Sequence, residues 1–174
     1  KQSLAFARNM QDLVKNKLTI RFLAGNHDMG KNVTYEELES DIDELYFHNK
    51  YIDLTDDIRL IGNNGWYDYS FVGNDYTEEE IQSFKNSYWY DRRIKQPITD
   101  KERFNINLKQ IKDQLLAAGN KQTIVVSHFV PREDYIKRFP NGDTRLDIAN
   151  AFLGSSKIGQ AVDQSYTIAT ITGH

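Results

Sequence analysis

The chain has 174 residues, of which 39% are apolar and 12% aromatic, so it can bury a hydrophobic core and has the length of one domain. Its 22 Lys and Arg against 25 Asp and Glu leave a net charge of −3, without a long basic run, which disfavours nucleic acid as a partner. The lack of cysteine excludes disulfides and thiolate metal sites and fits a cytoplasmic protein. No apolar run approaches the ~20 residues that a membrane helix needs.

Apolar periodicity and turn signals predict helices and strands that alternate along the chain. Helices are expected where apolar residues recur every three or four positions, and strands where short apolar runs are bounded by turn residues. In chain order the patterns predict a helix at 4–14, a strand at 18–25, a helix at 34–45, strands at 51–54 and 58–62, helices beginning at Thr77 and Thr99, strands at 122–129 and 166–174, and one or two short helices before the last strand. This alternation predicts an α/β fold, layered as a sandwich in a single domain.

The loop after the first predicted strand has two possible functions. In the segment RFLAGNHDMGKNV at 21–33, Gly25, Gly30 and Lys31 match the G-x-x-x-x-G-K frame of a nucleotide-binding P-loop. Asn32 stands where that motif needs a Ser or Thr, and the next helix signal begins only two residues later, so the backbone would cradle a phosphate poorly. A P-loop-like nucleotide binder is therefore the weaker alternative.

The other interpretation is that the loop presents side chains to a metal. Asn26, His27 and Asp28 offer an amide oxygen, an imidazole and a carboxylate at the edge where α/β sheets place ligands. His128 and His174 also follow predicted strands, in "IVVSHF" and "IATITGH". Because the carboxyl ends of parallel strands meet at one edge, these side chains are expected to converge there.

These motifs resemble those of the calcineurin-like metallophosphoesterase family, whose series runs D-x-H, G-D-x-x-D, G-N-H-[DE], a lone H and then G-H-x-H. This chain has GNHD at 25–28, SHFVP with His128, and GH at 173–174, in the same order. The resemblance spans residues 18–174. It implies the layered α/β sandwich of that family.

The resemblance also implies a reaction and a set of site residues. Two divalent metal ions (Mn, Fe or Zn) would form a dinuclear centre, with Asn26, His128 and His174 as ligands of one ion. A metal-bound hydroxide would attack a phosphate mono- or diester of a small phosphorylated substrate, and His27 would protonate the leaving group as general acid. The implied protein is a metal-dependent phosphoesterase.

Two departures from the family pattern matter. No D-x-H or G-D-x-x-D precedes Gly25, and the chain stops before the second His of G-H-x-H. We therefore expect the ligands of the other metal and the bridging carboxylate to lie outside these 174 residues, and this partial domain to be inactive alone. Gly25 and Asp28 are expected to order the loop rather than to bind metal. The alternative from another class is a non-catalytic binding platform on the same fold.

Between the motifs, residues 63–98 form an aromatic-rich excursion that is predicted as a possible cap. Its aromatic residues either pack in a core beneath it or face a substrate at the metal edge. Its arginines could clamp a phosphate or stack on a substrate ring. The predicted substrate contacts are Trp66, Tyr67, Trp89, Arg92 and Arg93.

Overall fold

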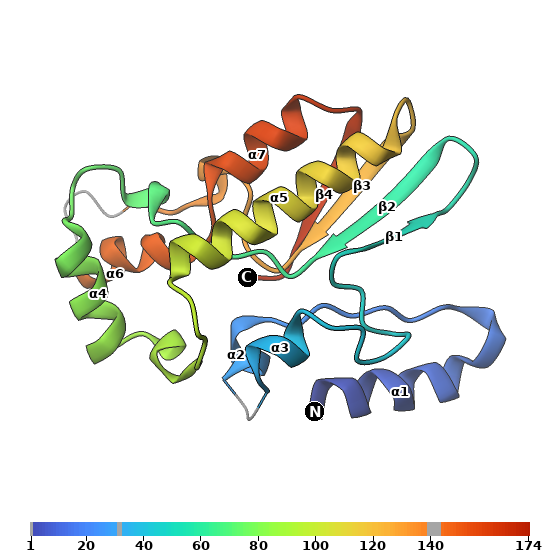
Figure 1. Ribbon diagram of the computed structural model, residues 1–174, viewed down its shortest axis with the longest axis horizontal. Coiled ribbons are helices and arrows are strands. Elements are labelled where there is room, and N and C mark those ends of the chain that lie inside the picture. The colour runs from blue at the N-terminus through green and yellow to red at the C-terminus, as the bar shows by residue number, and fades with distance from the viewer. Residues whose placement is uncertain (1, 31–32, 139–143) are drawn as a thin grey trace.

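The computed structural model describes residues 2–30, 33–138 and 144–174, and only the backbone of 144 and 145. Groups of helices alternate with the strands along the chain, and several short 3-10 turns lie between them (Figure 1). The helices are α1 (Gln2–Val14), α2 (Asn26–Met29), α3 (Tyr35–Leu38), α4 (Glu78–Ser87), α5 (Asp100–Ala118), α6 (Thr144–Ala149) and α7 (Ser156–Asp163). The strands are β1 (Lys50–Asp53), β2 (Ile58–Asn63), β3 (Gln122–Ser127) and β4 (Thr167–Thr172).

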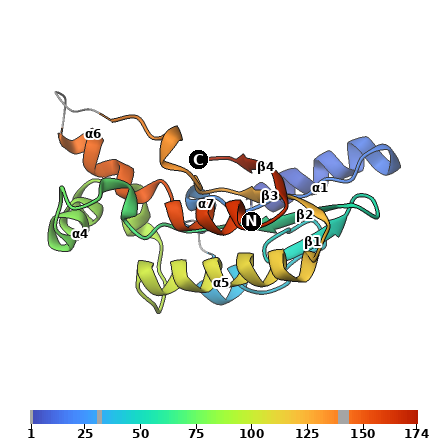
Figure 2. The ribbon, with the colours of Figure 1, turned by 90° about the horizontal axis from the view of Figure 1, so that it is seen from above.

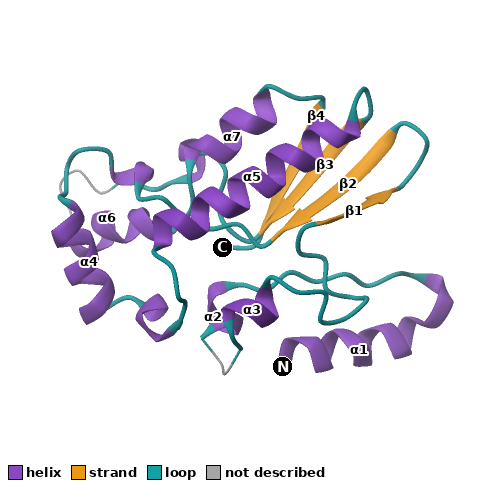
Figure 3. Cartoon of the chain, viewed as in Figure 1, coloured by secondary structure: helices purple, strands orange, loops and turns teal. Residues whose placement is uncertain are grey.

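The four strands form one mixed sheet in the order β1-β2-β3-β4 (Figure 3). β1 pairs antiparallel with β2 as a hairpin, whereas β2, β3 and β4 run parallel to one another. The register between β3 and β4 shifts at Thr123/Ile124, so Ser127 pairs with Thr172. The parallel strands therefore end together at one edge, and His128 and His174 lie just beyond it.

Helices α5 and α7 lie side by side over one face of the sheet (Figures 1 and 2). α5 begins at a capping box in which Thr99 accepts a hydrogen bond from the Glu102 N–H, and it ends at Gly119, whose φ is +60°. The apolar side chains of the two helices and the sheet are buried together, and each contributes about 1.5 to 3 kcal/mol by leaving water. This core includes Ile61, Phe104, Ile111, Leu115, Val125, Ile158 and Val162.

The aromatic excursion contributes a second part of the core. Trp66 is completely buried, stacks on Tyr67, and meets Phe129 edge to face. The indole N–H of Trp66 donates to Asp100 at 3.0 Å, and the guanidinium of Arg103 lies 3.9 Å from its ring centroid. The indole N–H, the only polar side-chain group of Trp66, is thus satisfied by the first residue of α5.

The α/β class is confirmed, as are the strands of the sheet and the helices expected at 4–14, after Thr77 and after Thr99. Two expectations are wrong. The segment at 18–25 is not a strand, because only Phe22 pairs, through an isolated bridge to Tyr46. The helix expected at 34–45 ends at Leu38, where the hydroxyl of Tyr46 donates to the free Leu38 carbonyl at 2.8 Å.

Within the residues that the structure describes, no helix is long and apolar enough to cross a bilayer.

Candidate metal centre

Three predicted ligands meet at the C-terminal edge of the sheet. The Nε2 atom of His128 lies 3.2 Å from Oδ1 of Asn26 and 2.9 Å from Nδ1 of His174. Asn26 is buried, at 3% exposure, at the start of α2, whereas His128 is half-buried and His174 exposed. The structure therefore brings together an amide oxygen and two imidazole nitrogens from three separate segments.

These separations suit a shared cation. Ligand atoms about 2.0 to 2.2 Å from a metal lie roughly 3 to 3.5 Å from each other in octahedral or tetrahedral geometry. All three atoms can present lone pairs. A proton on Nε2 of His128 could form a full hydrogen bond to only one of its two neighbours, Asn26 or His174. A divalent ion would satisfy all three at once, so the donor set fits one metal.

The protonation state of the two imidazoles also suits a metal. Burial lowers the pKa of His128 to about 4, and the nearby His27 adds to this effect while Asp28 opposes it. Partial desolvation lowers the pKa of His174 as well, with further lowering by the neighbouring His128. Both rings are therefore neutral at pH 7, which is the form that binds metals.

In the described part of the chain, no three His, Cys, Asp or Glu side chains gather in a way that could hold a metal. The site consists of one amide and two imidazoles instead.

Close approach between the GNHD loop and β3 depends on Gly25 and Asn64. A Cβ at Gly25 would lie 2.7 Å from Cε1 of His128, so the histidine ring occupies the space that a side chain there would fill. Asn64 accepts a hydrogen bond from the Ala24 N–H through its side chain at 3.0 Å, and another from the His128 N–H through its carbonyl at 3.1 Å. One residue thus ties both ligand-bearing segments together.

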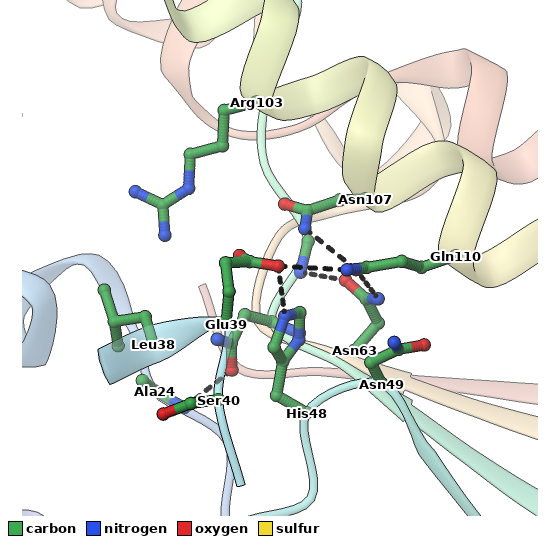
Figure 4. A network of polar contacts seen from close by, with 12 residues as sticks. Ala24, Leu38, Glu39, Ser40, His48, Asn49, Asn63, Arg103, Asn107 and Gln110 are labelled. Carbon is green, nitrogen blue, oxygen red and sulfur yellow. Dashed lines mark hydrogen bonds and ion pairs between the residues drawn. The ribbon is translucent and has the colours of Figure 1, made fainter. Parts of the chain in front are cut away.

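Asn64 is itself held by a buried histidine. The Asn64 N–H donates to Nδ1 of His48 at 3.0 Å, which leaves Nε2 as the protonated nitrogen that donates to Glu39 at 3.3 Å. Gln110 of α5 donates to the same carboxylate oxygen at 2.9 Å and accepts from Asn63 (Figure 4). This network joins α3, β2 and α5 behind the metal edge.

His27 faces solvent beside the three ligands. Its ring stacks on Tyr90 with centroids 3.9 Å apart and planes at 11°, and the Tyr90 hydroxyl donates to the His27 carbonyl at 3.1 Å. Tyr90 belongs to the 3-10 turn η3 (Tyr90–Arg93) of the aromatic excursion. The proposed general acid, His27, is therefore exposed to a substrate, and one face of its ring is held by Tyr90.

Asp28 orders the loop in the structure. Its carboxylate accepts from the Gly25 N–H at 3.1 Å and from the hydroxyl of Ser3. An amide that a phosphate cradle would use is thus already satisfied by the chain itself, which disfavours the P-loop alternative. Lys31 and Asn32, on which that alternative also rests, lie outside the described residues.

The predicted substrate contacts fall into three groups by exposure. Trp66 and Tyr67 are fully buried in the core, so direct substrate contact by these residues is not supported. Trp89 is half-buried and stacks on Phe152, with centroids 5.2 Å apart. Arg92 and Arg93 are exposed, and the Arg93 guanidinium lies 5.4 Å from the ring centroid of Tyr90, the residue that supports His27.

The sequence analysis missed three residues that shape the site. Asn64 could have been found, because it is a polar residue directly after a parallel strand. Tyr90 and Asp91 gave no such signal, since they lie in an irregular aromatic segment. Asp91 is completely buried and accepts from Nδ2 of Asn26 at 2.8 Å, and burial raises the pKa of its carboxyl despite that bond.

Comparison with known proteins identifies the family. The family model for calcineurin-like phosphoesterases matches residues 1–154, a range that contains Asn26, His27 and His128 but not His174. Searches of curated proteins and of solved structures gave no match. The family match agrees with the motifs at the strand ends and covers most of the sequence. The chain therefore belongs to the calcineurin-like phosphoesterase family.

Proposed function

We propose that this chain forms part of a metal-dependent phosphoesterase that hydrolyses a mono- or diester of a small phosphorylated substrate. Membership of a phosphoric ester hydrolase family supports the reaction class. The observation that carries the metal assignment is the approach of Nε2 of His128 to both Asn26 and His174, at 3.2 and 2.9 Å. Imidazole nitrogens and amide oxygens are donor types that Mn, Fe and Zn accept.

In this proposal each residue has a defined task. Asn26, His128 and His174 hold one ion, of Mn, Fe or Zn, and the dinuclear centre implied by the family resemblance includes a second. A divalent ion bound there supplies positive charge that offsets the phosphoryl oxygens and lowers the pKa of nearby water. His27, exposed beside the ligands, donates a proton to the departing oxygen. The exposed Arg92 and Arg93 contact the substrate phosphate.

The proposal is tested with the full-length protein, stripped of metal and reloaded with Mn, Fe or Zn. Hydrolysis of 4-nitrophenyl and alkyl phosphate esters is measured for the wild type, His27→Gln and His128→Gln. We expect His128→Gln to lose bound metal and activity on both esters. His27→Gln should keep its metal but lose about 10² to 10⁴ in kcat on the alkyl ester, which needs a proton donor, and less on the 4-nitrophenyl ester.

A full-length protein that binds metal but remains inert with all three ions would reject the enzyme. It would favour the second candidate, a non-catalytic binding platform.

A further inference from the structure

We propose that Asp91 is a positioning residue that fixes the side-chain amide of Asn26 with its oxygen toward His128. This inference rests on the proposed metal site, because the oriented oxygen is one of its three donors. It assigns a role to the aromatic excursion that neither the motifs nor the family match indicates.

The contacts of Asp91 are directional and buried. One carboxylate oxygen accepts from Nδ2 of Asn26 at 2.8 Å, and the other accepts from the indole N–H of Trp89 at 3.1 Å. Asp91 is 0% exposed and Asn26 is 3% exposed, so water cannot readily replace either bond. The indole is held in turn by stacking on Phe152.

The chemistry of the pair allows one orientation. An asparagine amide has a donor end and an acceptor end, whereas a carboxylate only accepts. Nδ2 of Asn26 must therefore face Asp91, and Oδ1 then faces His128 at 3.2 Å. If the amide were flipped, its oxygen would face the carboxylate of Asp91. Its NH₂ group, which has no lone pair to offer, would then face the metal. Asp91 thus selects the metal-binding orientation.

The same short turn contacts both neighbours in the loop. Asp91 binds the side chain of Asn26, and the adjacent Tyr90 supports the ring and carbonyl of His27. The α2 helix and η3 pack directly on each other, although 65 positions separate Asn26 from Asp91. The excursion therefore acts on the ligand loop from outside the sheet.

The experiment compares Asp91→Ala, Asp91→Asn, Asn26→Asp and the exchanged pair Asn26→Asp/Asp91→Asn in the full-length protein. The readouts are the Kd for Mn²⁺, the number of ions bound and the Tm of the metal-free protein. Removing a group that orients a metal ligand weakens metal binding by about 10- to 100-fold, and we expect this loss for Asp91→Ala. Asp91→Asn should lose less, because its oxygen can still accept from Asn26.

The exchanged pair separates positioning from simple structural support. It restores one donor facing one acceptor, so we expect it to bind Mn²⁺ more tightly than either single variant. Additive losses in the pair would overturn the proposal, and this comparison stands even if Asp91→Ala fails to fold. Asp68→Ala is the matched control, since Asp68 is a buried carboxylate of the same excursion that pairs with Lys157. It should lower the Tm without changing the Kd.

Failure of the metal site and failure of the proposed role of Asp91 give different results. A wild-type protein that binds no divalent ion would reject the metal site itself. Metal binding by the wild type with an equal Kd for Asp91→Ala would reject only the role of Asp91.

Discussion

His128 and Asn26 are 102 positions apart, yet Nε2 of the first lies 3.2 Å from Oδ1 of the second. The contact depends on the backbone around it. Asn64 binds the N–H groups of both Ala24 and His128, and Gly25 leaves room for the imidazole. Asn64 and Gly25, which would not themselves touch the metal, therefore bring the two ligand-bearing segments together.

Gly25→Ala should weaken metal binding without unfolding the protein. The new Cβ would lie 2.7 Å from Cε1 of His128, so the ring must move away from Asn26. We expect the Kd for Mn²⁺ to rise by about 10- to 100-fold, as for other changes that misplace a ligand. Isothermal titration of the full-length protein measures this. Gly73→Ala is the control for backbone strain alone, because Gly73 has a positive φ, which strains an alanine, but open space around it; it should lower stability without changing the Kd. An unchanged Kd for Gly25→Ala would contradict the geometry of the site.

Tyr90→Leu should lower kcat while leaving the Kd for metal unchanged. Tyr90 supports His27 by ring stacking and by a hydrogen bond to its carbonyl, so a leucine frees the proposed acid from its position. We expect kcat on an alkyl phosphate to fall about tenfold, because misplaced catalytic groups lose rate. Tyr90→Phe keeps the stacked ring and should lose less. Equal effects of the two variants would show that stacking does not hold His27.

Trp66→Phe should reduce stability rather than substrate binding. The variant loses the buried hydrogen bond to Asp100 and the indole surface beneath Arg103. We expect the free energy of unfolding in urea to fall by about 2 to 4 kcal/mol, with KM unchanged. The exposed Arg93→Ala should behave in the opposite way, raising KM at little cost in stability. A raised KM for Trp66→Phe would place the indole at the substrate after all.

Glu39→Gln should alter the pH dependence of stability. Burial acts to raise the pKa of the Glu39 carboxyl, but hydrogen bonds from His48 and Gln110 outweigh it, so the pKa lies below the usual 4.5. The charged form is favoured by folding, so its contribution is fully present well above pH 4.5 and is lost as the pH falls through the lower folded value. We expect the wild type to be more stable than Glu39→Gln by about 1 kcal/mol at pH 7.

That difference should shrink below pH 4.5 in urea unfolding curves. Glu44→Gln removes a carboxylate from an exposed position and serves as the control for loss of charge alone. A difference between wild type and Glu39→Gln that stays constant down to pH 3 would show that folding does not favour the charged form of Glu39.

Much of the fold follows from local sequence patterns, and the exceptions have tertiary causes. The capping boxes at Thr77 and Thr99 predicted where α4 and α5 begin, because those hydrogen bonds are local. The helix signal after Thr34 continues past Leu38, but the side chain of Glu39 is drawn into the buried network instead. The spacing of apolar residues carries no information about such a competing long-range contact.

The candidate site divides in the same way. His128 and His174 could be predicted because strand ends of a parallel sheet converge. Asp91 could not, since a lone acid in an irregular segment has the same signature whether it is solvated or buried. The role of Trp66 was left open for a related reason, because aromatic density predicts burial and binding equally well. The tertiary contacts of Asp91 with α2 and of Trp66 with α5 distinguish these outcomes.

The irregularity between β3 and β4 has a consequence for the two imidazoles. Thr123 pairs with Thr167, but Ile124 pairs with Ala169, so β4 carries one extra residue before its regular pairing resumes. With the same sequence but no register shift, every later residue of β4 would sit one step, about 3.3 Å, farther along and would project to the opposite side of the sheet. His174 would then overshoot His128 and point away from it. The register shift near the start of β4 thus determines how far along the sheet, and on which side of it, His174 lies.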